Sequence, residues 1–243
     1  FRSFAAFFDF SANLTDRLKV SLGARATRDH KRANVFRFFY LGATPSPYQG
    51  GANRPILQVR TNYDAARTFE QFTPRISVSY ELSDDLNTYA SFSKGYKSGG
   101  WDMRGDAFIT PQTTQGYLPE VVKTYEAGLK GYALDRRVSF SSAIFLSKYT
   151  NQQVTTQVVV PSGIASSVDN AGSSTLYGAE FEANAKLSSS LSANVALGYI
   201  HAKYDTFSRF VPAGAPDPLN PSTILSAGKV VNVADLYGFQ NTP

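Results

Sequence analysis

The chain has 243 residues, a net charge of +5 and no cysteine, so disulfides and thiolate metal sites are excluded. Its hydrophobic fraction is 42%, and no stretch approaches the roughly 18 consecutive apolar residues of a transmembrane helix. These values exclude a helical membrane protein but not a β-barrel, whose strands each give only a weak signal. The 14 Tyr and 18 Phe suit strands and the aromatic belts at membrane interfaces.

Eight long segments are predicted to be β-strands, because apolar and polar residues alternate in them with a period of two. In chain order they cover residues 2–12, 17–30, 66–82, 86–97, 120–134, 137–151, 173–187 and 190–204. Most exceed the roughly 9–11 residues that a strand needs to cross a bilayer. The sequence therefore predicts an all-β fold in which most strands are long enough to span a membrane.

The alternation gives each strand one apolar and one polar face. In the last predicted strand Val195 and Leu197 share a face, and Asn194 lies on the other. We expect apolar faces to contact lipid and polar faces to line a lumen, because a packed core would not accept unpaired charges. Lys94 is an exception, since it shares the face of Phe92 and would have to snorkel to the headgroups. The residues expected to face the lumen are Arg75, Glu81, Glu126, Lys130, Glu180, Glu182 and Lys186.

The connections between the predicted strands alternate in length. Short polar turns follow the first, third, fifth and seventh strands, and the other connections are long and rich in Gly, Pro, Ser and Asn. Short turns at one end and long loops at the other are typical of outer-membrane barrels, whose turns are periplasmic. Long external loops, irregular apart from short hairpins, are expected near residues 31–65, 98–119, 152–172 and 205–240.

Basic residues concentrate in one stretch of the chain. They are Arg25, Arg28, Lys31, Arg32 and Arg37. This stretch fits either a solvated strand end or a rim that contacts lipid phosphates. Nucleic acid is not an expected partner, because neither a recognition helix nor an aromatic-basic motif accompanies the charge.

No catalytic constellation emerges from the sequence. His30 and His201 lie near strand ends without a patterned second ligand, so a surface role is favoured over metal binding. Glu180 and Glu182 share a face and could mimic a pair of catalytic acids, but lumen-facing carboxylates are the simpler interpretation. We therefore expect no enzyme activity, no cofactor and no metal site.

Residues 97–117 are the best candidate for a ligand-binding loop. They contain Lys97, Trp101, Arg104 and Tyr117, and cations beside aromatic rings suit an anionic, often aromatic iron chelate. The alternative is that Trp101 only anchors the loop at the membrane interface.

Three segments resemble the barrel of a TonB-dependent outer-membrane receptor. They are FTPRISVSYELSDDLNTYASFSKGYKSGGWDMRG at 72–105, PEVVKTYEAGLKGYALDRRVSFSSAIFLSKYTNQQ at 119–153 and NAGSSTLYGAEFEANAKLSSSLSANVALGYIHAKY at 170–204. The resemblance covers nearly the whole chain except the long loops. It implies a transmembrane antiparallel β-barrel of about 22 strands closed around a plug. Residues 1–243 would form one partial barrel domain, an internal section whose edges pair with strands outside it.

The resemblance also implies a function. Such receptors import a scarce ligand across the bacterial outer membrane with energy from TonB, and a ferric siderophore is the expected substrate class. Cobalamin, haem and oligosaccharides remain open, as do a passive porin-like or structural barrel and a soluble all-β binding module. The expected partners are outer-membrane lipid and lipopolysaccharide, the TonB system through an N-terminal region outside this chain, and a small-molecule iron chelate.

Overall fold

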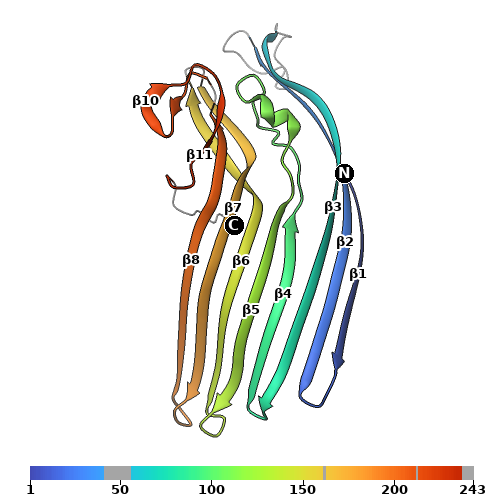
Figure 1. Cartoon of the computed structure of the whole chain (residues 1–243), viewed down its shortest axis with the longest axis vertical. Helices are drawn as coiled ribbons and strands as arrows, with labels where there is room; N and C mark the ends of the chain where they lie inside the picture. The colour runs from blue at the N-terminus through green and yellow to red at the C-terminus, as the bar shows by residue number, and fades with distance from the viewer. Residues whose placement is uncertain (41–55, 161–162, 212, 237–243) are drawn as a thin grey trace.

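The chain forms an open antiparallel β-sheet (Figure 1). The computed structural model describes residues 1–40, 56–160, 163–211 and 213–236. The main strands are β1 (Arg2–Asn13), β2 (Leu18–Tyr40), β3 (Ile56–Ser83), β4 (Leu86–Lys97), β5 (Glu120–Ala133), β6 (Val138–Val160), β7 (Gly163–Lys186) and β8 (Ser192–Val211). The short ones are β9 (Pro216–Asp217), β10 (Asn220–Ile224) and β11 (Lys229–Asn232).

The sheet is a meander in which each strand pairs with the next along the chain. Nine strands follow one another in the order β1 to β8 and then β11, while β9 and β10 form a separate hairpin. Every pairing is antiparallel. The all-β prediction is confirmed. Among the described residues, no helix is long and apolar enough to cross a bilayer.

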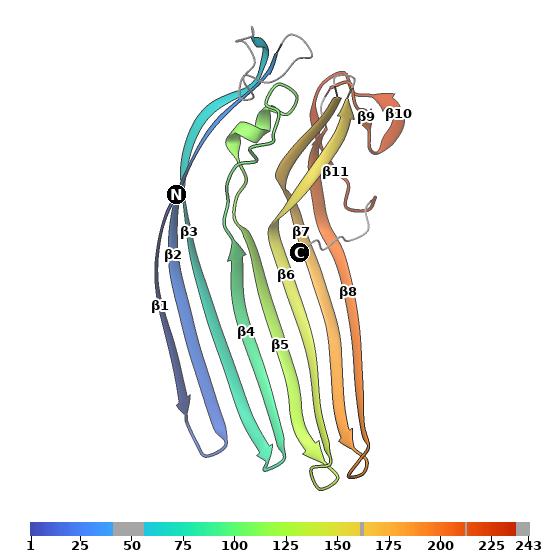
Figure 2. The ribbon, with the colours of Figure 1, turned by 180° about the vertical axis from the view of Figure 1, so that it is seen from behind.

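The four short turns lie together at one end of the sheet, as predicted. Both views place the β1–β2, β3–β4, β5–β6 and β7–β8 turns at the same end, with the longer connections at the other (Figures 1 and 2). Arg137 closes one turn, since its backbone N–H donates to the carbonyl of Leu134 at 3.0 Å. We call these two ends the turn end and the loop end.

Two of the four expected loops, residues 31–65 and 152–172, are largely strand in their described parts, which corrects the sequence interpretation. β2 and β3 pair from Leu18 out to Tyr40, and β6 and β7 pair out to Val160. Residues 41–55 and 161–162 lie outside the described part of the chain. In the β2–β3 arm, residues 31–40 and 56–65, the simple alternation fades because the 98–119 loop covers the polar face, where Ala33 is only 3% and Val35 7% exposed. In the second arm the Val- and Thr-rich composition favours strand without alternation.

Another of the expected loops, residues 98–119, is irregular as predicted. It joins β4 to β5 and contains one short 3₁₀ helix, η2 (Pro111–Gln115). An isolated bridge between Gly100 and Tyr117 closes its base, with both backbone N–H groups donating across it. Beyond β8 the chain continues through the β9–β10 hairpin to β11.

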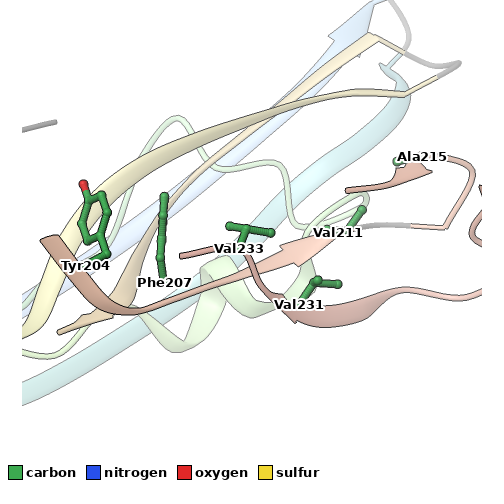
Figure 3. Packing of buried hydrophobic residues seen from close by; sticks show 6 residues of the cluster. All are labelled: Tyr204, Phe207, Val211, Ala215, Val231 and Val233. Carbon is green, nitrogen blue, oxygen red and sulfur yellow. The ribbon is translucent and has the colours of Figure 1, made fainter. Parts of the chain in front are cut away.

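The one hydrophobic cluster of buried residues that the described part of the chain forms lies at the loop end (Figure 3). β8 and β11 supply most of its side chains, which are Tyr204, Phe207, Val211, Ala215, Val231 and Val233. Along the spanning part of the sheet, by contrast, large apolar side chains are open: Phe4 is 72% exposed, Ile144 63% and Leu197 64%. A contiguous apolar surface of this kind needs a partner, and lipid supplies one.

A single charge placed on each face tests this assignment. Val195→Arg in the complete barrel should lower the free energy of unfolding by about 2–4 kcal/mol if Val195 lies near the bilayer midplane. Asn194→Arg should be tolerated far better, because Asn194 lies on the polar face of β8, opposite to the face of Val195. Refolding titrations into bilayers measure both. Equal losses at the two positions would contradict the assignment of faces.

Candidate functional site

The polar face of the sheet carries most of the residues expected in a lumen. Backbone register places Lys130 of β5 opposite Ser141 of β6, and Ser141 opposite Glu182 of β7. One hollow of about 430 Å³ near the turn end is lined by Glu81, Lys130 and Glu182, among others. These three predicted residues therefore lie around one concave surface.

A second hollow of about 430 Å³ adjoins the first. Glu126 and Glu180 line it, together with Tyr89 of β4. The Tyr89 hydroxyl donates to Glu126 Oε1 at 2.6 Å, and Lys130 Nζ lies 5.3 Å from the centre of the Tyr89 ring. The phenol thus links a carboxylate to an ammonium group. We call Glu126, Glu180 and Glu182 the acidic strip, and none of these three carboxylates forms an ion pair among the described residues.

Two aromatic residues on this face escaped the sequence analysis. The Tyr89 ring lies over Gly128, where an added Cβ would come within 2.7 Å of it, and the Phe145 ring lies over Gly178 at 2.6 Å. Glycine is needed at both positions because a side chain would displace the ring. The alternation of faces along β4 could have revealed Tyr89, because it lies on the face opposite to that of Ala90. Phe145 was hidden in the unbroken apolar run from Ile144 to Leu146.

The other two residues of the predicted lumen set lie apart from these hollows. Arg75 pairs with Asp9 at 2.8 Å, across β2, at the side of the sheet near β1. Lys186 is exposed at the turn end of β7. Among the described residues there is no cluster of three groups able to hold a metal ion.

At the loop end, residues 98–119 fold back onto the polar face of the β2–β3 arm. A buried ion pair holds them there: Arg60 Nη2 lies 2.7 Å from Asp106 Oδ2, with side chains only 4% and 5% exposed. The guanidinium lies 5.1 Å from the Phe39 ring centre and 4.7 Å from that of Phe108. Two aromatic rings and a carboxylate thus enclose one cation.

Further hydrogen bonds tie the loop to the arm. Thr61 donates its hydroxyl proton to the carbonyl of Gly105 at 2.9 Å and accepts from the N–H of Ala107 at 3.0 Å. Lys31 Nζ donates to the carbonyl of Gly99 at 2.7 Å. Trp101 packs edge-on against Phe69, with ring centres 6.5 Å apart. The loop is therefore pinned along its length rather than free above the sheet.

The predicted ligand residues divide into two groups. Trp101 and Tyr117 come together and line a hollow of about 360 Å³, with Phe1, Lys31 and Met103 beside them. Arg104, with 67% of its side chain exposed, instead pairs with Asp102 at 3.0 Å. Lys97 is exposed at the end of β4. Lys31 and Met103 were not expected in this group, because only folding brings them next to the loop.

Burial keeps the phenols of this region neutral. Desolvation raises the pKa of Tyr117, and the nearby Asp102 carboxylate raises it further. The same two causes raise the pKa of Tyr63 on the arm. The indole Nε1 of Trp101 is buried and has no hydrogen-bond acceptor among the described residues. The lining of the hollow thus combines aromatic rings with the ammonium group of Lys31.

The basic stretch predicted on β2 divides between the two faces. Arg28 pairs with Glu70 at 3.4 Å and Arg32 with Asp64 at 2.6 Å on the apolar face, and Asp64 raises the pKa of Arg32. Lys31 is engaged with the loop, as described above. These pairings compensate Arg28 and Arg32, whereas Arg25 donates to Thr27 Oγ1 at 3.1 Å and Lys31 to a carbonyl, so the charges of these two remain.

Comparison with known proteins identifies the family. The model of the TonB-dependent receptor-like β-barrel matches residues 1–235. The chain belongs to this family. Members of the family are transporters of the Gram-negative outer membrane rather than enzymes, so the chain is a section of an outer-membrane barrel.

Individual relatives agree with this assignment. The chain is 30% identical over 153 residues to the ferric-pyoverdine 358 receptor of Pseudomonas putida, covering 61% of this chain and 15% of that receptor. It is 39% identical over 80 residues to the metal-pseudopaline receptor CntO of Pseudomonas aeruginosa, covering 32% and 10%. The structure of the ferric yersiniabactin uptake receptor FyuA from Yersinia pestis matches with a TM-score of 0.64 at 20% identity, over 83% of this chain and 27% of that one.

The buried ion pair of the loop yields a prediction. Asp106→Ala in the complete receptor leaves the Arg60 charge buried without a partner, which costs about 3–5 kcal/mol for such pairs. We expect amide hydrogen exchange to accelerate across residues 99–117 while the spanning strands keep their protection.

The exposed pair of the same arm supplies the control. Asp64→Ala removes the partner of Arg32, and exposed pairs contribute little to stability. Loop exchange should stay at its original rate in this variant. Equal acceleration in both variants would mean that the Arg60–Asp106 pair does not hold the loop.

Proposed function

We propose that the complete receptor imports a metal chelate, most simply a ferric siderophore, with energy supplied by TonB. Family membership supports this substrate class, and so do the relatives named above, which are receptors for ferric-pyoverdine and metal-pseudopaline. The observation that carries the proposal is the pinned loop 98–119, which presents an aromatic and cationic hollow at the loop end.

The chemistry of the hollow suits such a ligand. Trp101 and Tyr117 provide flat surfaces for stacking, and Lys31 provides an ammonium group for an anionic chelate. Arg104 and Lys97 lie further out, where they would attract the ligand through long-range charge rather than hold it. Because the loop is already ordered, little conformational entropy would be lost on binding.

The acidic strip of the polar face has a different part in the proposal. Glu126, Glu180 and Glu182 would face the lumen and contact basic groups of the plug that the family carries. Such contacts would bear on transport and not on recognition of the ligand at the cell surface. The TonB system would act through that plug and its N-terminal segment.

Growth on defined iron sources tests the function. Cells that lack their own copy of this receptor should grow on one ferric siderophore only when the complete receptor is supplied, and only when TonB is present. Uptake that persists without TonB would support a passive porin-like barrel instead. Uptake of cobalamin, haem or an oligosaccharide in place of iron would change the substrate class.

A residue-level prediction concerns the hollow. Trp101→Ala with Tyr117→Ala should weaken ligand binding to intact cells by about 10- to 100-fold, from the loss of two stacking contacts of about 1 kcal/mol or more each. Arg104→Ala should have a smaller effect that diminishes with added salt. Arg136→Ala at the turn end should change nothing. Unchanged affinity in the double variant would assign the two aromatic residues to loop anchoring alone.

A further inference from the structure

Four lysines form a row across the apolar face of the sheet. Lys94 of β4 lies directly opposite Lys123 of β5, and Lys123 lies directly opposite Lys148 of β6. The row continues through Thr175 of β7 to Lys203 of β8. Lys123, Lys148 and Lys203 are exposed. This face is the one that the architecture of outer-membrane barrels turns toward lipid.

No acid lies directly opposite any of the four lysines in the register. Among the described residues, none of the four lysines forms an ion pair. Asp205, two residues after Lys203 on β8, accepts a hydrogen bond from Thr175 at 2.8 Å. Arg28 and Arg32 on the same face of β2 differ from the row, because each pairs with an acid on β3. The lack of partners is therefore a property of this row and not of basic residues on this face.

Such an arrangement costs stability unless an anion is bound. Directly opposed residues in an antiparallel pair lie about 4.5–5.5 Å apart, and like charges at that distance destabilise a sheet. Two pairs in the row, Lys94–Lys123 and Lys123–Lys148, are directly opposed in this way. A bound polyanion would turn the repulsion into attraction.

The row lies at the level where a bilayer ends. The lysines are 8 to 11 residues from the turn ends of their strands, at Leu86, Ala133, Val138 and Ser192, and about 9–11 residues span a membrane. One step closer to the turns lies an aromatic row, with Phe92–Tyr125 and Tyr177–His201 ring centres 5.0 and 4.9 Å apart. Aromatic belts mark the interface of the hydrocarbon.

We propose that the lysine row binds the phosphates of lipid A in the outer leaflet. The leaflet beside the loop end of an outer-membrane barrel carries this bisphosphorylated glycolipid, and its acyl chains would lie along the apolar face below the lysines. Neighbouring strands are about 4.8 Å apart, so the row offers several ammonium groups to phosphates at the same height. This inference rests on the family and the register, and it is independent of which ligand is imported.

Binding of purified lipid A to the complete receptor tests the proposal. The delipidated receptor is titrated in detergent with EDTA present, so that divalent cations do not bridge lipids, and native mass spectrometry counts the bound molecules. Lys123→Gln with Lys148→Gln should weaken binding roughly 10- to 30-fold, since each lysine near an anionic lipid surface contributes about fivefold. Lys203→Gln, a single change, should weaken binding about fivefold.

Matched variants separate the row from general effects of charge. Lys19→Gln with Lys186→Gln removes the same charge from the polar face and should leave lipid A binding unchanged. Lys123→Arg with Lys148→Arg keeps the charge and should retain binding within about threefold. This variant tests the role of the charge even if the Gln pair does not fold. Heat-modifiable gel mobility checks the folded state of each variant.

The competitors decide which anion the row recognises. Lipid A with one phosphate removed should bind more weakly, and phosphatidylethanolamine or inorganic phosphate should displace lipid A only at large excess. The proposal is overturned if the Gln variants at Lys123, Lys148 and Lys203 bind lipid A as tightly as the original receptor. Displacement by stoichiometric inorganic phosphate, or an equal loss in the polar-face variant, would also overturn it.

Discussion

The pairing of backbone hydrogen bonds constrains everything else in this chain. Water is absent from the bilayer core, so each N–H and C=O there must find a partner in the protein. The antiparallel pairing of each strand with the next, from β1 to β8, meets this need strand by strand. Such pairing fixes a side-chain period of two, and the period separates an apolar face from a polar one. The sheet has free edges at β1 and beyond β8 within the described residues, and the remaining strands of the family's barrel would pair with them.

The loop end obeys different rules because water reaches it. Backbone groups there can be satisfied by solvent or side chains, so the chain leaves the sheet at residues 98–119 and returns to it. Its order comes from side-chain chemistry, above all the enclosed Arg60–Asp106 pair. A buried pair of this kind contributes little net stability relative to an apolar contact, but breaking it is costly. It therefore specifies one loop position, and that position brings Trp101 and Tyr117 next to Lys31.

Much of the spanning region could be predicted from the sequence, because alternation and turn residues are local signals. All eight long strands and the four short turns are where the pattern placed them. The strand extensions at 31–40 and 152–160 were missed because alternation weakens where a loop covers the polar face or where β-branched residues follow one another. Only two of the four expected ligand residues meet in one hollow, since loop position depends on Arg60, which is distant in sequence. The parity of Lys94 was visible in its own strand, but the lysine row required the register of five strands.

The central claim is that one face of this sheet contacts lipid and the other an aqueous lumen. Spin labels placed singly along β5, from Thr124 to Lys130, in the complete receptor in bilayers test it most directly. Accessibility to oxygen, which partitions into lipid, should peak at Tyr125, Ala127 and Leu129. Accessibility to a water-soluble nickel reagent should peak at the residues between them, with a period of two. Accessibilities without that alternation, or with the two reagents peaking at the same residues, would contradict the account.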